Sequence, residues 1–200
     1  MSLLRLLPLL CLSLGLFGCA SFTPSGPLQP SSERASQPLA QRAQIEPVRI
    51  SDAGLDSAAQ QIIGEQLTRD IGMHVASSGH FSQLLSFPAT LGEQDLRLHF
   101  EFSSLKGRRT THPAYFPGAL ATLTLWIWVN GPIYVDHYDI AGNLSITDAA
   151  GKPLASSRQQ LRMKNNTGLW DADYFAASGS TQLTRLVQDL LSDATRQLPR

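Results

Sequence analysis

Cysteine is nearly absent from this 200-residue sequence, and its two copies, Cys11 and Cys19, both lie within the first nineteen positions. The rest of the chain can therefore hold no disulfide framework, thiolate metal site or cysteine nucleophile. An excess of charge of one sign is also lacking, because 16 basic residues balance 16 acidic ones. A balanced chain offers no electrostatic reason to expect nucleic acid or an anionic membrane surface as a partner.

The motifs of several enzyme classes are missing as well. There is no Gly-x-Ser-x-Gly elbow, no phosphate-binding loop and no dinucleotide fingerprint. Asp136, His137 and Asp139 are close in sequence, but only His137 and Asp139 would share a face of a strand. Two ligands are fewer than the three or four that a metal site needs. We therefore expect no metal, no cofactor and no enzymatic activity.

The chain begins with a short apolar segment. Met1–Arg5 carries one positive side chain, and Leu6–Phe17 is a 12-residue apolar run. This run has the length of a signal-peptide core and is too short to span a bilayer. Residues 1–18 are predicted to be a signal peptide that is cleaved between Gly18 and Cys19. An ordinary secretory leader with an incidental cysteine and an uncleaved anchor remain as alternatives.

The end of this leader, Leu16-Phe17-Gly18-Cys19, resembles the bacterial lipobox. The resemblance implies that Cys19 receives a diacylglyceryl group on its sulfur and, after cleavage, an acyl chain such as palmitate on its amine. Phe17 departs from the pattern, which prefers a smaller residue. Ala20 stands where an Asp would signal retention in the inner membrane, so the resemblance implies sorting to the outer membrane. The covalent lipid would be the only attached group.

The next segment differs in composition from the rest of the chain. Residues 20–44 are rich in Pro, Ser and Gln and sustain no period of 2 or 3.6 residues. We expect residues 19–44 to form the lipidated cysteine and a disordered tether, and residues 45–200 to form a single periplasmic domain.

Hydrophobic periodicity predicts an α+β fold for that domain. The fold is a two-layer sandwich, with a mostly antiparallel sheet of about five to six strands and two amphipathic helices on one face. The expected helices run from Ser57 to Ser78 and from Ser180 to about Leu198. The expected strands are Ile45–Ile50, His80–Phe87, Gln94–Ser104, Gly118–Asn130 (covered on both faces), Ile133–Thr147 and Leu154–Lys164, with a loop over Leu105–Pro117.

Two groups of side chains are candidates for an interaction surface. Lys106, Arg108 and Arg109 form a basic group on the expected loop, where a solvated turn is the alternative. Aromatic residues crowd the central hairpin, where core packing is the alternative: Trp126, Trp128, Tyr134 and Tyr138.

From Leu120 onward the chain has an apolar segment, a Gly-Pro turn, a Tyr-containing strand, an Asp-Ala-Ala-Gly-Lys hairpin and a final helix. This order resembles small uncharacterised proteobacterial outer-membrane lipoproteins. The helix Ser57–Ser78 followed by Gly79-His80-Phe81 is similar to lipoproteins that form rings around outer-membrane export pores.

The resemblances imply a non-catalytic lipid-anchored envelope protein on the outer membrane, with its domain facing the periplasm. It would act as an accessory or assembly subunit through contacts with another envelope protein or with itself. A periplasmic lipid- or glycan-binding module is the alternative, and an enzyme is the third reading.

Overall fold

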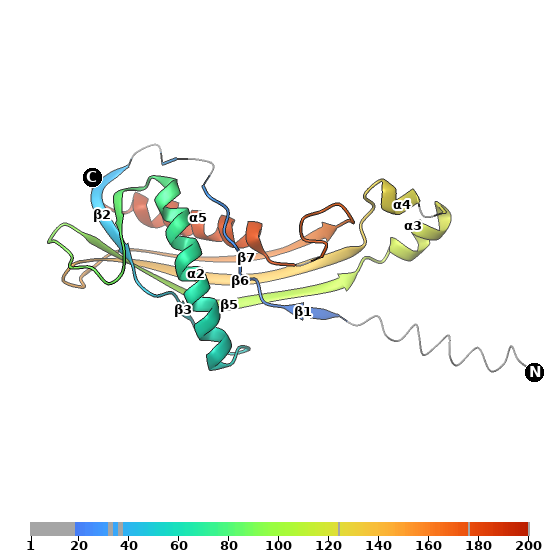
Figure 1. The fold of residues 1–200 in the computed structure, drawn as a ribbon, viewed down its shortest axis with the longest axis horizontal. Coiled ribbons are helices and arrows are strands. Elements are labelled where there is room, and N and C mark those ends of the chain that lie inside the picture. The colour runs from blue at the N-terminus through green and yellow to red at the C-terminus, as the bar shows by residue number, and fades with distance from the viewer. Residues whose placement is uncertain (1–18, 32–33, 36–37, 124, 176, 200) are drawn as a thin grey trace, which may run out of the picture. The chain divides into compact units, whose positions relative to one another are not determined.

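A computed structural model describes residues 19–31, 34–35, 38–123, 125–175 and 177–199. The signal peptide predicted over residues 1–18 lies outside them. The described residues form an α+β fold with an open, mixed sheet, which confirms the predicted fold class (Figure 1). The strands are β1 (Ala20–Phe22), β2 (Leu39–Ile45), β3 (Arg49–Ile50), β4 (Phe81–Leu85), β5 (Leu96–Thr111), β6 (Tyr134–Asp148) and β7 (Pro153–Thr167). The helices are α2 (Ser57–Ser78), α3 (Tyr115–Ala121), α4 (Leu125–Trp128) and α5 (Ser180–Arg196).

The sheet has seven strands, slightly more than predicted, in the order β4-β2-β5-β6-β7 with β1 and β3 also paired to β5. β1 is antiparallel to β5, whereas β2 and β3 run parallel to β5 and β4 runs parallel to β2. Parallel neighbours need a long crossover, and the 22-residue helix α2 lies within the crossover from β2 to its parallel neighbour β4. The parallel pairing was not predicted because β2 falls within the segment interpreted as a tether.

The described residues group into two compact units. Within the described residues, unit 1 comprises 19–22, 107–137 and 164–177, and unit 2 comprises the remaining segments. Strands β5, β6 and β7 each contribute residues to both units.

Unit 2 has an apolar core between its part of the sheet and helices α2 and α5. Alternate residues of β5 and β6 are buried, as period 2 predicts: Leu96, Leu98, Phe100, Phe102, Tyr138, Ile140, Leu144 and Ile146. Helix α5 buries a stripe of Leu183, Leu186, Val187, Leu190, Leu191 and Ala194. The side chain of Leu186 lies against Gly142 of β6, and Phe102 lies against the same glycine. Each fully buried Leu or Phe contributes about 1.5–3 kcal/mol.

The ends of α2 agree with the prediction. The side chain of Asp56 accepts a hydrogen bond from the Ala59 amide at 2.8 Å, which caps the first turn. Gly79 ends the helix in the left-handed conformation, at φ 67°. Helix α5 also begins after a left-handed glycine, Gly179, although Ser180 was the predicted cap.

Several described residues of the segment predicted to be a disordered tether, residues 19–44, contact the rest of unit 2. Leu28 is buried, and the carbonyl of Ser25 accepts a hydrogen bond from Gln66 of α2. The Gln29 amide donates to Thr184 of α5, and the Gln29 carbonyl lies 2.7 Å from Nδ1 of His74. The segment is held by hydrogen bonds and isolated apolar contacts, so its sequence shows no periodicity.

Strand β5 also runs further than predicted, through Thr111 instead of ending at Ser104. Leu105 is buried, and its amide donates to the buried carboxylate of Asp52 at 2.7 Å. Buried positions shift from even to odd numbers between Phe102 and Leu105. Because the alternation changes phase here, a search for a two-residue period does not detect that the strand continues.

Truncating Phe102 to Ala should lower the free energy of unfolding by about 3–5 kcal/mol, because the side chain is fully buried and its removal leaves a cavity. Urea titration followed by far-ultraviolet circular dichroism would measure the loss. Ser103→Ala, an exposed position on the same strand, is the control and should change stability little. Equal losses in the free energy of unfolding for the two variants would contradict the assignment of Phe102 to the buried face of β5 and Ser103 to the exposed face.

The stability of unit 2 should also depend on pH through His80. Burial and the neighbouring His74 lower the pKa of His80 below its usual 6.5. The imidazole of His80 is therefore protonated more readily in the unfolded chain than in the folded one. The contribution of neutral His80 to the free energy of unfolding is complete above about pH 6.5 and is lost as the pH falls toward the folded-state pKa. Urea midpoints of the wild type and His80→Gln, compared between pH 7.5 and 5.5, would show a smaller pH dependence in the variant. The same dependence in both would contradict the prediction.

Candidate functional site

Cys19 lies at the start of unit 1 and is exposed. The strand that follows it, β1, pairs with β5 so that Ala20 lies opposite Arg109 and Phe22 opposite Gly107. A Cβ atom at Gly107 would overlap the ring of Phe22, so this close approach requires glycine. The Cys19 sulfur lies 2.8 Å from Nη2 of Arg108. The pairing therefore holds the predicted lipidation site at a defined place on unit 1.

An ion pair ties the strands of unit 1 together. Nε and Nη2 of Arg109 donate to the two carboxylate oxygens of Asp136 at 2.6 and 2.7 Å, and Asp136 is fully buried. The hydroxyl of Thr167 donates to the same carboxylate at 2.8 Å. Arg109 therefore links β5 to β6, and Thr167 adds β7 to the cluster.

The remaining donors of Arg109 are also engaged. They bind the backbone carbonyls of Asp173 and Tyr174 at 2.6 and 2.7 Å, and the ring of Tyr134 lies 4.8 Å from the guanidinium carbon. Only 13% of the Arg109 side chain is exposed. These contacts give Arg109 a structural role, and a guanidinium held in this way offers little to a ligand.

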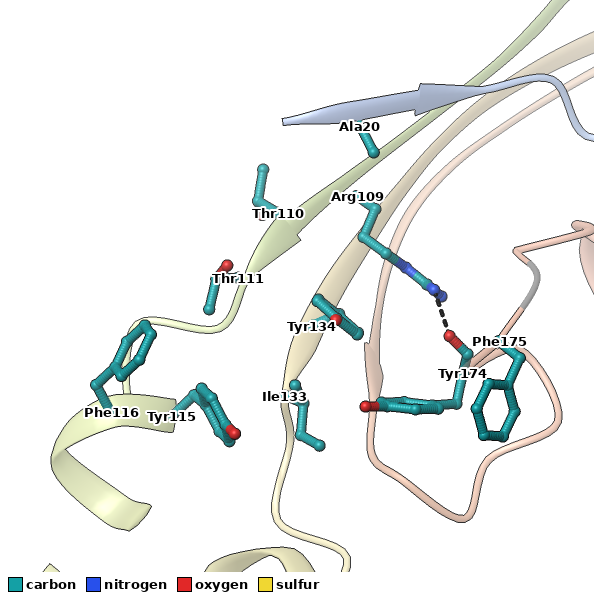
Figure 2. A pocket seen from close by; sticks show the side chains of 10 residues that line it. All are labelled: Ala20, Arg109, Thr110, Thr111, Tyr115, Phe116, Ile133, Tyr134, Tyr174 and Phe175. Atoms are coloured by element: carbon teal, nitrogen blue, oxygen red, sulfur yellow. Dashed lines mark hydrogen bonds between the residues drawn. The ribbon is translucent and has the colours of Figure 1, made fainter. Parts of the chain in front are cut away.

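A recess of about 480 Å³ opens beside this ion pair in unit 1 (Figure 2). Aromatic rings and hydroxyl groups line it together with the first residue of β1: Ala20, Arg109, Thr110, Thr111, Tyr115, Phe116, Ile133, Tyr134, Tyr174 and Phe175. Burial, followed by the nearby Tyr134 and Tyr115, raises the pKa of Tyr174 above its usual 10. The lining includes no carboxylate or histidine that could act as a base toward the threonine hydroxyls.

The described residues of the apolar stretch Gly118–Asn130 belong to the end of α3, to α4 and to turns, and not to the buried strand that was predicted. The Thr122 hydroxyl donates to the Gly118 carbonyl and accepts from the Trp126 amide, at 2.8 and 2.9 Å. The indole of Trp126 covers Gly118 and Gly131, where a Cβ atom would meet the ring at 2.5 Å. These local contacts stabilise the helical turns.

Neither α3 nor α4 buries any of its described residues. Large apolar side chains are exposed instead, with Leu120 at 78%, Leu123 at 85% and Trp128 at 70%. We call the exposed set the apolar surface of unit 1: Phe116, Leu120, Leu123, Leu125, Trp128, Val129, Trp170 and Phe175. Covering one such side chain is worth about 1.5–3 kcal/mol, and an exposed group of this kind marks an interaction site.

The residues predicted to form an interaction surface differ in exposure and are divided between the two units. Lys106, Arg108 and Trp128 are exposed, and Trp126 and Tyr134 are half-buried. Tyr138 is only 3% exposed and belongs to the core of unit 2. Lys106, Arg108 and Arg109 lie on β5 and not on a loop. The prediction missed the exposed leucines, because a run without charges was interpreted as a strand covered on both faces.

The face of the sheet opposite the helices in unit 2 is polar and open. It forms a shallow recess of about 530 Å³ lined by Glu101, Ser103, Ser104, Asp139, Ala141, Gly142, Asn143, Arg158, Gln159, Gln160 and Arg162. Asp139 accepts hydrogen bonds from Gln160 at 2.8 Å and Arg162 at 3.3 Å, and these contacts lower its pKa.

Asp136 and Asp139, considered above as metal ligands, both accept hydrogen bonds from protein groups. Across the described part of the chain, no three His, Cys, Asp or Glu side chains gather as metal ligands would.

No helix within the described ranges is long and apolar enough to cross a membrane.

No family model matches the sequence, and no curated protein matches it. Among solved structures, a Xanthomonas campestris protein of the family DUF330 is similar with 13% identity and a TM-score of 0.48, over 87% of this chain and 94% of its own. A minor lipoprotein from Acinetobacter baumannii has 13% identity and a TM-score of 0.34, over 81% and 92%. An uncharacterised lipoprotein B from Nitrosomonas europaea has 12% identity and a TM-score of 0.34, over 82% and 83%.

Replacing Arg109 with Met should destabilise unit 1 by about 3–5 kcal/mol, because it leaves the buried carboxylate of Asp136 without its counter-charge. All three tryptophans lie in unit 1, so tryptophan fluorescence during urea unfolding reports on this unit. Arg108→Met is the matched control, because Arg108 is exposed on the same strand of unit 1 and its replacement should change stability little. A loss in Arg109→Met no larger than in the control would show that the buried pair does not hold unit 1 together.

Proposed function

We propose that this chain is a non-catalytic, lipid-anchored protein of the bacterial cell envelope that acts as an accessory or assembly subunit. Its lipid is attached to Cys19, it sits on the outer membrane, and its folded part faces the periplasm. The observation that carries the proposal is the placement of Cys19. The cysteine is exposed, precedes a paired strand, and belongs to the same unit as the apolar surface.

The anchor explains why a cysteine should be held at that place. A thioether-linked diacylglyceryl group needs an exposed sulfur, which Cys19 has, and an N-linked acyl chain needs a free amino terminus, which cleavage before Cys19 would supply. Two or more acyl chains give a stable membrane anchor, at about 0.8 kcal/mol for each buried methylene. With Arg108 beside the sulfur, a cationic group would lie at the level of the lipid phosphates.

We assign the contact with another envelope protein, or with a second copy, to the open face of unit 2. This face carries charged and amide side chains, and hydrogen bonds between Asp139, Gln160 and Arg162 order them. Polar, partly hydrated surfaces with arginine are common in protein interfaces that form and separate. Both helices of unit 2 lie on the other face of the sheet, so a partner would meet this one directly.

A periplasmic binding module for a lipid or a glycan is the second candidate. The recess in unit 1 favours it, because Tyr115, Tyr134 and Tyr174 present rings around a space of about 480 Å³. Aromatic rings stack on sugars, and a recess of this size lies within the range of small-molecule sites. An enzyme is the weaker reading, since the shifted carboxylates Asp95 and Asp139 have arginine partners away from that recess.

Native mass spectrometry of the full-length protein, extracted from bacterial membranes in mild detergent, should show a chain that lacks residues 1–18 and carries three acyl chains. The acyl mass should disappear in Cys19→Ser, because serine has no sulfur to modify. A wild-type mass without acyl chains would contradict the anchor. A lipidated monomer that retains a small molecule would favour the binding module.

The same spectra test the open face. The double variant Arg158→Glu with Arg162→Glu reverses two charges on this face. It should reduce the amount of the complex with the protein partner about tenfold or more, because like charges then face the partner. The control variant is Arg69→Glu with Arg185→Glu, the same change at exposed positions on α2 and α5. An equal loss in both variants would contradict the assignment of this face.

A further inference from the structure

The apolar surface of unit 1 contains no charged side chain. From Tyr115 to Val135 the sequence has no Asp, Glu, Lys or Arg. Helices α3 and α4 lie against each other without burying any of their described residues (Figure 1). A helix that faces water normally carries polar residues on its outer side. This pair presents leucine and tryptophan there, which is typical of a contact surface.

Charges of both signs flank this surface, and the basic ones precede α3 in the sequence. No acidic residue occurs between Glu101 and Asp136, whereas Lys106, Arg108 and Arg109 all fall in that interval. Arg108 is exposed on unit 1, while Arg109 is satisfied by Asp136. Asp171 and Asp173 lie between Trp170 and Phe175, and Asp171 accepts hydrogen bonds from the Asn130 side chain and the Gly168 amide. Arg108, whose Nη2 lies beside the Cys19 sulfur, is the group on unit 1 that can meet the phosphates of lipid headgroups.

The predicted anchor lies close to the same surface. Ala20, which directly follows Cys19, lines the recess of unit 1 together with Phe116 of α3 and Phe175. The exposed rings of Trp128 and Trp170 lie 6.2 Å apart. Indole rings concentrate at the boundary between headgroups and acyl chains, where one part of the ring is wet and the other is not. Acyl chains on Cys19 would bring this surface to that boundary.

We infer that the apolar surface of unit 1 inserts into the membrane to which the anchor is attached, as a second point of attachment. The inference rests on the proposed function, because the anchor brings unit 1 to the bilayer. The side chains on α3 and α4 would reach about 5–10 Å into the boundary between headgroups and acyl chains, without spanning the bilayer. Two points of attachment would restrict the rotation of unit 1 relative to the membrane, which a lipid chain alone does not.

The test uses the full-length protein, extracted with its lipid and reconstituted into vesicles in which phosphatidylethanolamine is in excess over phosphatidylglycerol. The chain's three tryptophans, Trp126, Trp128 and Trp170, all report on unit 1. Lipids brominated near the headgroup end of the acyl chain should quench them strongly, and lipids brominated near the chain end should quench them less. No quenching by either lipid would overturn the inference.

The variant Leu120→Gln with Leu123→Gln should reduce the quenching by about half, because polar side chains favour withdrawal into water. The matched control is Ile62→Gln with Met73→Gln, which changes apolar side chains of α2 that are 65% and 62% exposed in unit 2. Quenching in the control should equal that of the wild type. Quenching that is unchanged in the leucine variant would overturn the inference. Val129→Gln replaces the double variant if circular dichroism shows that the latter does not fold.

The mass of Cys19, measured on the same samples, separates this inference from the proposed function. Acylated protein whose tryptophans are not quenched retains the anchor and overturns the insertion. Unacylated protein whose tryptophans are quenched on added vesicles retains the insertion and overturns the anchor. Unquenched tryptophans in a protein that cross-links to a second copy through Trp128→Cys would show that the surface is a protein interface instead.

Discussion

The structure of unit 2 depends on one constraint, which is that its long strands have an apolar face that must be covered. Leu98, Phe100 and Phe102 of β5 continue into the buried side chains of β6, and α5 lies against them through Leu186. Burial of this face is the largest favourable term available to the chain. The segment that contains Leu28 is then held in place by α2 and α5, which accounts for order in a stretch with no periodicity of its own.

Unit 1 is organised by polar contacts where unit 2 has an apolar core. Arg109 and Asp136 neutralise each other, and Thr167 and two loop carbonyls complete their hydrogen bonds. A polar centre of this kind specifies which strands and loops meet but offers little apolar area to cover. The leucines of α3 and α4 therefore stay outside it. The exposed apolar side chains are a consequence of how unit 1 is built, and they lie on the unit that carries Cys19.

Local signals predicted the regular elements well. Helix α2 begins after the cap Asp56 and ends at Gly79, and β6 and β7 meet at a hairpin, because capping and turn residues act over a few positions. The errors have physical causes as well. Ala43 and Leu96 pair across the parallel strands β2 and β5, which no local pattern reveals. The run Gly118–Asn130 is apolar enough for a buried strand or a helix, and periodicity does not distinguish them over so few residues.

Composition and periodicity alone determined the α+β class, the two long helices and the lack of cysteine after Cys19, whereas the candidate lipid site at Cys19 came from the resemblance of Leu16-Phe17-Gly18-Cys19 to the lipobox. These features depend on residue type, order and spacing, which the sequence contains directly. Only the tertiary structure decided that Arg109 forms a buried ion pair, that Tyr138 belongs to the apolar core, and that Leu120 and Leu123 are exposed. Each of these depends on which distant segments lie against a side chain. A partner such as Asp136, 27 positions away, is set by strand pairing and not by local sequence.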